Sequence, residues 1–194
     1  GGPAVILGVG RLTHEKNFPM LLHAFSLLRA RRPVRLLIFG EGRERSRLEA
    51  LVKALGLGSD VVLPGHIANP YAAYARASLF ALSSDTEGLP GVLIEALACG
   101  CPVVSTDCPS GPAEILERGR YGTLVPSGDP AAFAEAMAYT LDNPPAADFL
   151  RQRGAEFSLD RSVKQHMALM EDLLASAALR DHRAAKTGRL EGAA

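Results

Sequence analysis

The sequence predicts an α/β fold built on a Rossmann-like, doubly wound parallel sheet. Short apolar runs alternate with segments in which apolar residues recur every three or four positions, as expected for a repeated β-α order. Most of these runs are apolar at consecutive positions, which is typical of strands covered by helices on both faces of a sheet. Hydrophobic residues make up 47% and charged residues 22% of the chain, which is ordinary for a globular domain.

Six strands and their following helices can be placed in order along the chain. The predicted strands are 5–10, 34–40, 61–65, 79–84, 102–106 and 122–126. Helical patterns are predicted at 18–28, at 48–55, after Asn69-Pro70, from about Pro90 or Gly91, at 112–117, from 130 to 154, and from Ser158 onward. The repeated unit favours one open sheet rather than two separate domains.

One domain is expected to cover residues 1–177, followed by a flexible tail at 178–194. No internal repeat marks an earlier boundary, whereas the helical periodicity is lost after about Ala178. The mild positive charge of the tail is interpreted as solvated rather than as a membrane-surface helix. Because the chain starts without Met and almost directly on a strand, we expect that a preceding domain has been removed.

Charge and cysteine content exclude several classes of function. The formal net charge is zero, so a nucleic-acid partner is not expected. No apolar run is long enough to cross a membrane, and no signal peptide is visible. Cys99, Cys101 and Cys108 lack the spacing of a disulfide framework or a zinc site and are interpreted as structural thiols. These features suggest a cytoplasmic protein.

The loop after the first strand carries two cations where a ligand is expected, because open α/β sheets bind ligands at the carboxyl ends of their strands. Gly8 and Gly10 resemble the start of a dinucleotide fingerprint, but Thr13 stands where its third glycine belongs. Arg11 and Lys16 lie just beyond the strand and suit a phosphate group. The alternative is that both are ordinary surface cations.

The segment between Glu87 and Glu95 combines a glycine-rich turn with the start of a helix. Gly88 to Gly91 follow a strand, and the exposed amides of a helix N-terminus form an anion site. Glu95, near the second turn of the helix, can accept hydrogen bonds from two vicinal hydroxyls such as those of a ribose. Glu87 can accept one from a sugar. The alternative is that Glu87 caps the helix and Glu95 is a surface charge.

This segment closely resembles the signature of family 4 glycosyltransferases, retaining enzymes of the GT-B architecture. In that signature seven residues separate two glutamates, and the matching residues here are Ser84, Glu87, Gly88, Pro90, Glu95, Ala96, Ala98, Gly100, Pro102, Val103 and Val104. The family's first-loop pattern is matched by Gly10, Arg11, Leu12, Lys16 and Asn17. Further similarity is found at 40–42, 63–65 and 110–116, so the resemblance extends from about Val5 to Asp142.

The resemblance implies a role for each candidate residue. Arg11 and Lys16 neutralise the donor diphosphate, Glu95 holds the ribose, and Glu87 positions the donor sugar; we assign Arg11, Lys16 and Glu87 to catalysis. The remaining substrate-binding candidates are Gly10, Gly42, His66, Ile67, Gly88, Leu89, Pro90 and Gly91. Of these, His66 and Ile67 contact the base through their backbone. Glu41 and Arg43 are weaker candidates.

By this resemblance the chain is the C-terminal, nucleotide-sugar-binding domain of a two-domain transferase. Its partners are a nucleotide-sugar donor, an acceptor glycan or glycolipid, and a missing N-terminal Rossmann-like domain. It acts in the cytoplasm or peripherally at the inner face of the membrane, without cofactor or metal, and the fragment alone binds donor without transferring sugar. The alternatives are a non-catalytic binding module and a dinucleotide-binding oxidoreductase domain.

Overall fold

Residues 2–174 are described in a computed structural model, and the chain divides into two units after Ala155. The first unit contains an α/β sheet, and in the second residues 159–174 are helical. The predicted end of the domain at residue 177 and the predicted tail at 178–194 lie outside the described residues. None of the helices within residues 2–174 combines the length and the apolar character needed to cross a membrane.

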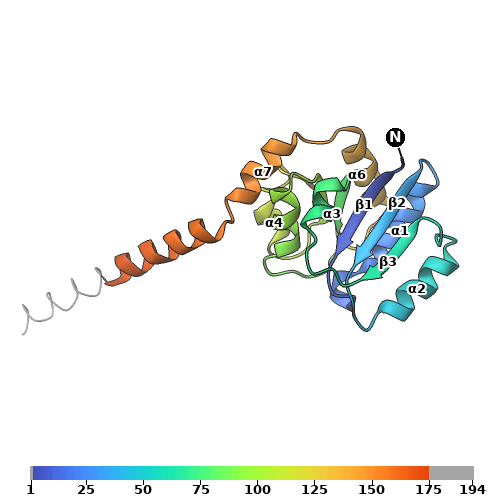
Figure 1. The fold of residues 1–194 in the computed structure, drawn as a ribbon, viewed down its shortest axis with the longest axis horizontal. Coiled ribbons are helices and arrows are strands. Elements are labelled where there is room, and N and C mark those ends of the chain that lie inside the picture. The colour runs from blue at the N-terminus through green and yellow to red at the C-terminus, as the bar shows by residue number, and fades with distance from the viewer. Residues whose placement is uncertain (1, 175–194) are drawn as a thin grey trace, which may run out of the picture. The chain divides into compact units, whose positions relative to one another are not determined.

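The sheet has six strands in the order β3-β2-β1-β4-β5-β6, and every neighbouring pair is parallel (Figure 1). This is the strand order of a doubly wound Rossmann sheet, so the predicted fold is confirmed. The strands lie within two residues of their predicted bounds and are β1 (Ala4–Val9), β2 (Val34–Phe39), β3 (Val61–Gly65), β4 (Leu79–Leu82), β5 (Val103–Thr106) and β6 (Thr123–Val125).

Helices cover both faces of the sheet. One layer contains α1 (Phe18–Arg29), α2 (Arg45–Ala54) and α6 (Pro130–Asp142). The other contains α3 (Tyr71–Arg76), α4 (Gly91–Ala98), α5 (Pro112–Ile115) and α7 (Ala147–Ala155). Every residue of β4 and of β5 is buried, which explains why their sequences are not an alternation of apolar and polar positions.

Capping residues define where two of the longer helices begin. Asn17 adopts a left-handed conformation (φ 42°, ψ 45°), which Asn tolerates better than most residues, and its side chain accepts a hydrogen bond from the Met20 N–H. Asp129 accepts one from the Ala132 N–H, and Pro130 then opens α6, where its missing donor is not needed.

The order of the strands places a topological switch point between β1 and β4, which in doubly wound sheets is where the ligand crevice lies. These strands are neighbours, but the chain continues from β1 to β2 on one side and from β4 to β5 on the other. The chain therefore continues in opposite directions after these two strands, and such a switch point is where doubly wound sheets bind ligands. The loop after β1 contains the short 3-10 helix η1 (His14–Lys16).

Candidate functional site

The loops after β1 and β4 are joined by hydrogen bonds into one structure. The Ser83 hydroxyl donates to the carbonyl of Lys16 at 2.9 Å, and the Asp85 N–H donates to the carbonyl of Glu15 at 2.9 Å. The side-chain amide of Asn17 donates to Asp85 Oδ1, also at 2.9 Å. Asn17 thus caps α1 and holds the opposite loop, so that the crevice has a fixed wall.

Lys16 and Glu87 meet across this crevice. Lys16 Nζ lies 2.5 Å from Glu87 Oε1, and the Ser84 hydroxyl donates to the same oxygen at 2.6 Å. The two side chains are only 19% and 9% exposed, respectively. Within residues 2–174 no donor reaches Glu87 Oε2, so this oxygen can accept a hydrogen bond from a ligand hydroxyl.

The turn after Glu87 leads into a helix start that the described side chains do not cap. If Glu87 capped α4, its carboxylate would accept a hydrogen bond from a backbone N–H at the start of that helix. It binds Lys16 and Ser84 instead, so the capping alternative is wrong. Within the described part of the chain, the N–H groups of Gly88 and Leu89 have no hydrogen-bond acceptor, and both residues are exposed. Pro90 is buried and Gly91, exposed, begins α4. Amides and a helix start in this arrangement favour an anion.

The turn rests on the segment before α5. Gly111 has a left-handed φ of 75°, and a Cβ atom there would lie 2.1 Å from the carbonyl oxygen of Gly88 and 2.6 Å from Pro90 Cδ. The Ser110 hydroxyl adds a long hydrogen bond, 3.4 Å, to the carbonyl of Glu87. Gly111 therefore allows the close backbone approach that supports the turn.

Glu95 lies on α4 and is half-buried. Its Oε2 accepts a hydrogen bond of 3.2 Å from the hydroxyl of Tyr74 on α3. Burial raises the pKa of Tyr74 well above its usual range, and the negative charge of Glu95 adds a smaller effect in the same direction. The hydroxyl therefore keeps its proton and remains a donor. Sequence reasoning misses Tyr74 because α3 is too short to show a periodic pattern.

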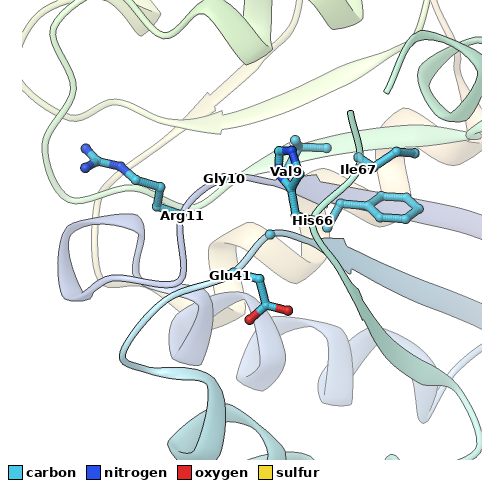
Figure 2. A pocket seen from close by; sticks show the side chains of 8 residues that line it. Val9, Gly10, Arg11, Glu41, His66 and Ile67 are labelled. Carbon is cyan, nitrogen blue, oxygen red and sulfur yellow. The ribbon is translucent and has the colours of Figure 1, made fainter. Parts of the chain in front are cut away.

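A pocket of about 390 Å³ opens at the carboxyl ends of β1, β2 and β3 (Figure 2). Its lining consists of Val9, Gly10, Arg11, Phe39, Gly40, Glu41, His66 and Ile67. The structure thus brings together four predicted site residues, namely Gly10, Arg11, His66 and Ile67. Figure 2 shows the exposed Arg11 side chain extending away from His66 and Ile67, which leaves the apolar part of the pocket without a cation.

The two glycines after β2 lie close to backbone of the loop after β1. A Cβ atom at Gly40 would lie 1.8 Å from the carbonyl oxygen of Gly10, and one at Gly42 would lie 2.3 Å from that of Leu12. Gly42, a predicted substrate-binding residue, is exposed and is not part of the pocket lining. The two glycines in the sequence indicate that another group lies very close to this segment. In the structure that group is the backbone of the loop after β1.

Glu41 lines the pocket but is already paired. Arg45 binds both of its carboxylate oxygens, at 2.7 and 2.9 Å. The hydrogen bonds from Arg45 lower the pKa of the Glu41 carboxyl. A dinucleotide-binding oxidoreductase needs an acidic residue near this strand end to bind the ribose of its cofactor. Glu41 is the acidic residue at this place, and its carboxylate is already bound by Arg45. The guanidinium of Arg43, the other weak candidate, lies 3.8 Å from a carboxylate oxygen of Glu15.

The described residues contain no group of three or more His, Cys, Asp or Glu side chains that could hold a metal ion. The three cysteines have free thiols; Cys101 and Cys108 are buried, whereas Cys99 is only partly buried. Burial raises the pKa of Cys101 to about 12 and raises that of Cys108 as well.

Known proteins resemble the chain over most of its length. A family model described as Glycosyl transferases group 1 matches residues 1–157. The Campylobacter jejuni N-acetylgalactosamine-N,N'-diacetylbacillosaminyl-diphospho-undecaprenol 4-alpha-N-acetylgalactosaminyltransferase is 43% identical over 120 residues, which are 62% of this chain and 32% of that protein. A second C. jejuni protein, GalNAc-alpha-(1->4)-GalNAc-alpha-(1->3)-diNAcBac-PP-undecaprenol alpha-1,4-N-acetyl-D-galactosaminyltransferase, is 30% identical over 175 residues, or 87% of this chain and 48% of that protein.

The fold is shared with solved glycosyltransferases of the GT-B architecture. The pneumococcal O-GlcNAc transferase GtfA, in complex with UDP and GlcNAc, superposes with a TM-score of 0.78 at 22% identity, covering 89% of this chain and 37% of that one. The chain therefore spans between about a third and a half of each of these three proteins. Because the family model covers residues 1–157 of the 194, the chain belongs to the family of glycosyl transferases group 1.

Proposed function

We propose that the chain is the C-terminal, donor-binding half of a retaining family 4 glycosyltransferase, and that it binds a nucleoside diphosphate sugar without metal. The observation that carries this proposal is the meeting of Lys16 and Glu87 at the carboxyl ends of β1 and β4, just before the start of α4. A diphosphate needs positive charge and a sugar needs hydrogen-bonding groups. Both are available in one crevice.

In the proposed complex the parts of the donor follow the crevice. The base occupies the pocket that is lined by Gly10, His66 and Ile67. The ribose hydroxyls bind Glu95, and the diphosphate lies by Arg11, Lys16 and the start of α4. The donor sugar is held by Glu87 and by the turn 88–91.

The proposed reaction proceeds with retention at the anomeric carbon. The bond from that carbon to the diphosphate oxygen breaks, and the acceptor oxygen bonds to the carbon on the same face. The acceptor's proton passes to the departing diphosphate oxygen. Lys16, Arg11 and the N-terminus of α4 stabilise the charge that develops there, as a divalent metal does in other transferases.

The donor and acceptor classes are suggested by the relatives. Both C. jejuni proteins are named as N-acetylgalactosaminyltransferases acting on undecaprenol-linked sugars, and GtfA was solved with UDP and GlcNAc. We therefore propose a UDP-N-acetylhexosamine as donor and a glycan or lipid-linked glycan as acceptor. The reaction takes place in the cytoplasm or at the inner face of the membrane.

Transfer is proposed to need a second Rossmann-like domain, N-terminal to this one, that forms the opposite wall of the cleft and holds the acceptor. Enzymes gain much of their rate by holding both reactants in the right geometry and by excluding water. The loops after β1 and β4 are assigned to the donor. The 194-residue chain is thus expected to bind donor and to show no sugar transfer.

A thermal-shift screen tests the proposal. The chain, in EDTA, is mixed with each of four donors: UDP-GlcNAc, UDP-GalNAc, GDP-mannose and ADP-glucose. The Glu95→Gln variant is measured in the same way for comparison. The expected result is a higher melting temperature with the UDP sugars, reduced in the variant, because a ligand that binds only the folded state stabilises it. No shift with any of the four donors contradicts the proposal. Donor hydrolysis or transfer by the full-length protein then separates an enzyme from a non-catalytic binding module.

A further inference from the structure

Tyr74 is a fully buried tyrosine whose hydroxyl reaches the carboxylate of Glu95. A buried tyrosine hydroxyl normally finds a hydrogen-bond partner, and most side-chain hydrogen bonds go to the backbone or to water. Here it is a half-buried carboxylate that forms no ion pair with any residue in 2–174. No other donor among the described residues reaches either oxygen of Glu95.

The tyrosine ring packs against the sheet, and the helix that carries it contacts α4. It packs edge-on against Phe80 of β4, with ring centroids 5.4 Å apart and an interplanar angle of 77°. Its helix is also tied to α4 at a second point, where the Cys99 thiol lies 3.7 Å from the carbonyl oxygen of Tyr71. The hydroxyl therefore has a fixed position relative to α4, the helix that carries Glu95.

A fixed donor matters because a glutamate side chain is otherwise mobile. Holding a glutamate in one rotamer loses side-chain entropy, and a group that is already held binds its ligand more tightly. Tyr74 occupies Oε2 on one side and leaves Oε1 and the remaining lone pairs of the carboxylate for a ligand. Two vicinal hydroxyls match these remaining acceptor sites.

We propose that Tyr74 is a positioning residue that holds the Glu95 carboxylate in the orientation in which it accepts hydrogen bonds from the ribose hydroxyls of the nucleotide. The inference rests on the proposed function, in which Glu95 binds the ribose. Tyr74 acts through Glu95 and does not contact the ligand. Its effect on affinity must therefore depend on both the carboxylate of Glu95 and the hydroxyls of the ribose.

This dependence can be measured by calorimetry with two ligands, UDP and 2′,3′-dideoxy-UDP. The Tyr74→Phe variant keeps the ring and its contact with Phe80 but loses the hydroxyl. We expect it to weaken UDP roughly threefold to tenfold and to change the affinity for the dideoxy analogue by less than about twofold. In a Glu95→Gln background, where the ribose contact is already impaired, Tyr74→Phe should cause little further loss.

Tyr121→Phe is the matched control. Tyr121 is also buried, and its ring stacks on Phe149 at a centroid distance of 4.5 Å. It precedes the amino end of β6, whereas the candidate site lies at the carboxyl ends of the strands. This variant should bind both ligands as the unchanged chain does. Melting temperatures of all variants show whether each one is folded under the conditions of the titration.

Each outcome bears on a different claim. Equal weakening of UDP and dideoxy-UDP by Tyr74→Phe means that the tyrosine has a purely structural role, and the inference is wrong. If Glu95→Gln weakens UDP but not the dideoxy analogue while Tyr74→Phe binds UDP normally, the ribose site stands and only the role of Tyr74 is overturned. If the unchanged chain binds neither UDP, GDP nor ADP, the proposed function fails and this inference fails with it.

Discussion

Lys16 and Glu87 form an ion pair of 2.5 Å although they belong to different loops, one after β1 and one after β4. Ser84 donates to the same carboxylate oxygen, so Glu87 would keep a partner if Lys16 turned to another anion. In the proposed complex Lys16 exchanges this carboxylate for the diphosphate. Both side chains are largely buried, and a buried charge without a partner is costly. The ion pair supplies each charge with its partner.

Replacing Lys16 with Ala should weaken UDP more than uridine. Only the nucleotide carries the charge that Lys16 neutralises, and hydrogen bonds to charged groups contribute about 1.5–3 kcal/mol. Calorimetry with the two ligands measures the difference. Lys53→Ala, an exposed lysine at the end of α2, is the control and should change neither affinity. Equal losses for UDP and uridine would mean that Lys16 does not contact the diphosphate.

The two glutamates of the motif should affect different ligands. Glu95→Gln is expected to weaken UDP and UDP-sugars alike, because the ribose is present in both. Glu87→Gln should spare UDP and weaken the intact UDP-sugar by about 1.5–3 kcal/mol, since its Oε2 is the acceptor left for the sugar. Competition binding with UDP and UDP-GlcNAc measures both. Equal losses of UDP in the two variants would overturn this division.

Gly111→Ala should destabilise the chain and disturb the donor-sugar turn. The new Cβ would lie 2.1 Å from the carbonyl oxygen of Gly88, so the turn 88–91 must move. Gly128→Ala is a matched control, because Gly128 has a similar φ of 78° but a Cβ atom there would meet open space, with no contact within 4 Å. Both variants place a Cβ on a residue of positive φ, which costs about 1–2 kcal/mol in the left-handed helical conformation.

The difference between these glycine variants isolates the clash. Urea denaturation should show a larger loss of unfolding free energy for Gly111→Ala than for Gly128→Ala, accompanied by weaker binding of UDP-sugar in the first variant alone. Identical losses of stability and unchanged binding would show that the segment before α5 does not support the turn.

The buried thiols should make the chain less stable at alkaline pH. Burial raises the pKa of Cys101 from 9.0 to about 12. Between these values the unfolded chain has lost a proton that the folded chain keeps, so this contribution to stability is complete below pH 9.0 and is lost as the pH rises toward about 12. Urea denaturation across this range should show a shallower decline for Cys101→Ala than for the unchanged chain. A parallel decline would contradict the burial of the thiol.

The same burial predicts slow reaction with thiol reagents. The thiolate is the reactive form, and a buried thiol with a raised pKa supplies little of it near pH 8. In the folded chain Cys101 and Cys108 should react far more slowly with a disulfide reagent than in urea. Rapid reaction of all three cysteines without denaturant would argue against the fold described for β5 and the segment after it.

The sheet could be predicted from the sequence because its signals are local. Consecutive apolar residues such as those of β4 mark buried strands, and the helices α1 and α6 have buried faces of regular spacing. The strand ends differ from the predicted ones by at most two residues, since the last residue of a strand depends on pairing with a neighbour that the pattern does not reveal.

The site could be predicted only in part because its contacts are not local. The spacing of the motif residues reveals them, but the pairing of Lys16 with Glu87 joins positions 71 residues apart in the chain. Tyr74 escapes prediction because nothing in a short helix indicates which side chain faces α4. Gly42 stays a predicted substrate-binding residue, and its lack of a Cβ is required in any case by the carbonyl oxygen of Leu12, which would lie 2.3 Å from that atom.

The most direct test of the proposed donor site is calorimetric titration of the 194-residue chain with UDP in EDTA, repeated with magnesium and with manganese. We predict binding in EDTA, of similar affinity when either metal is added, because Arg11, Lys16 and the start of α4 supply the positive charge. Binding that requires a metal, or the absence of binding under all three conditions for UDP, GDP and ADP, would contradict it.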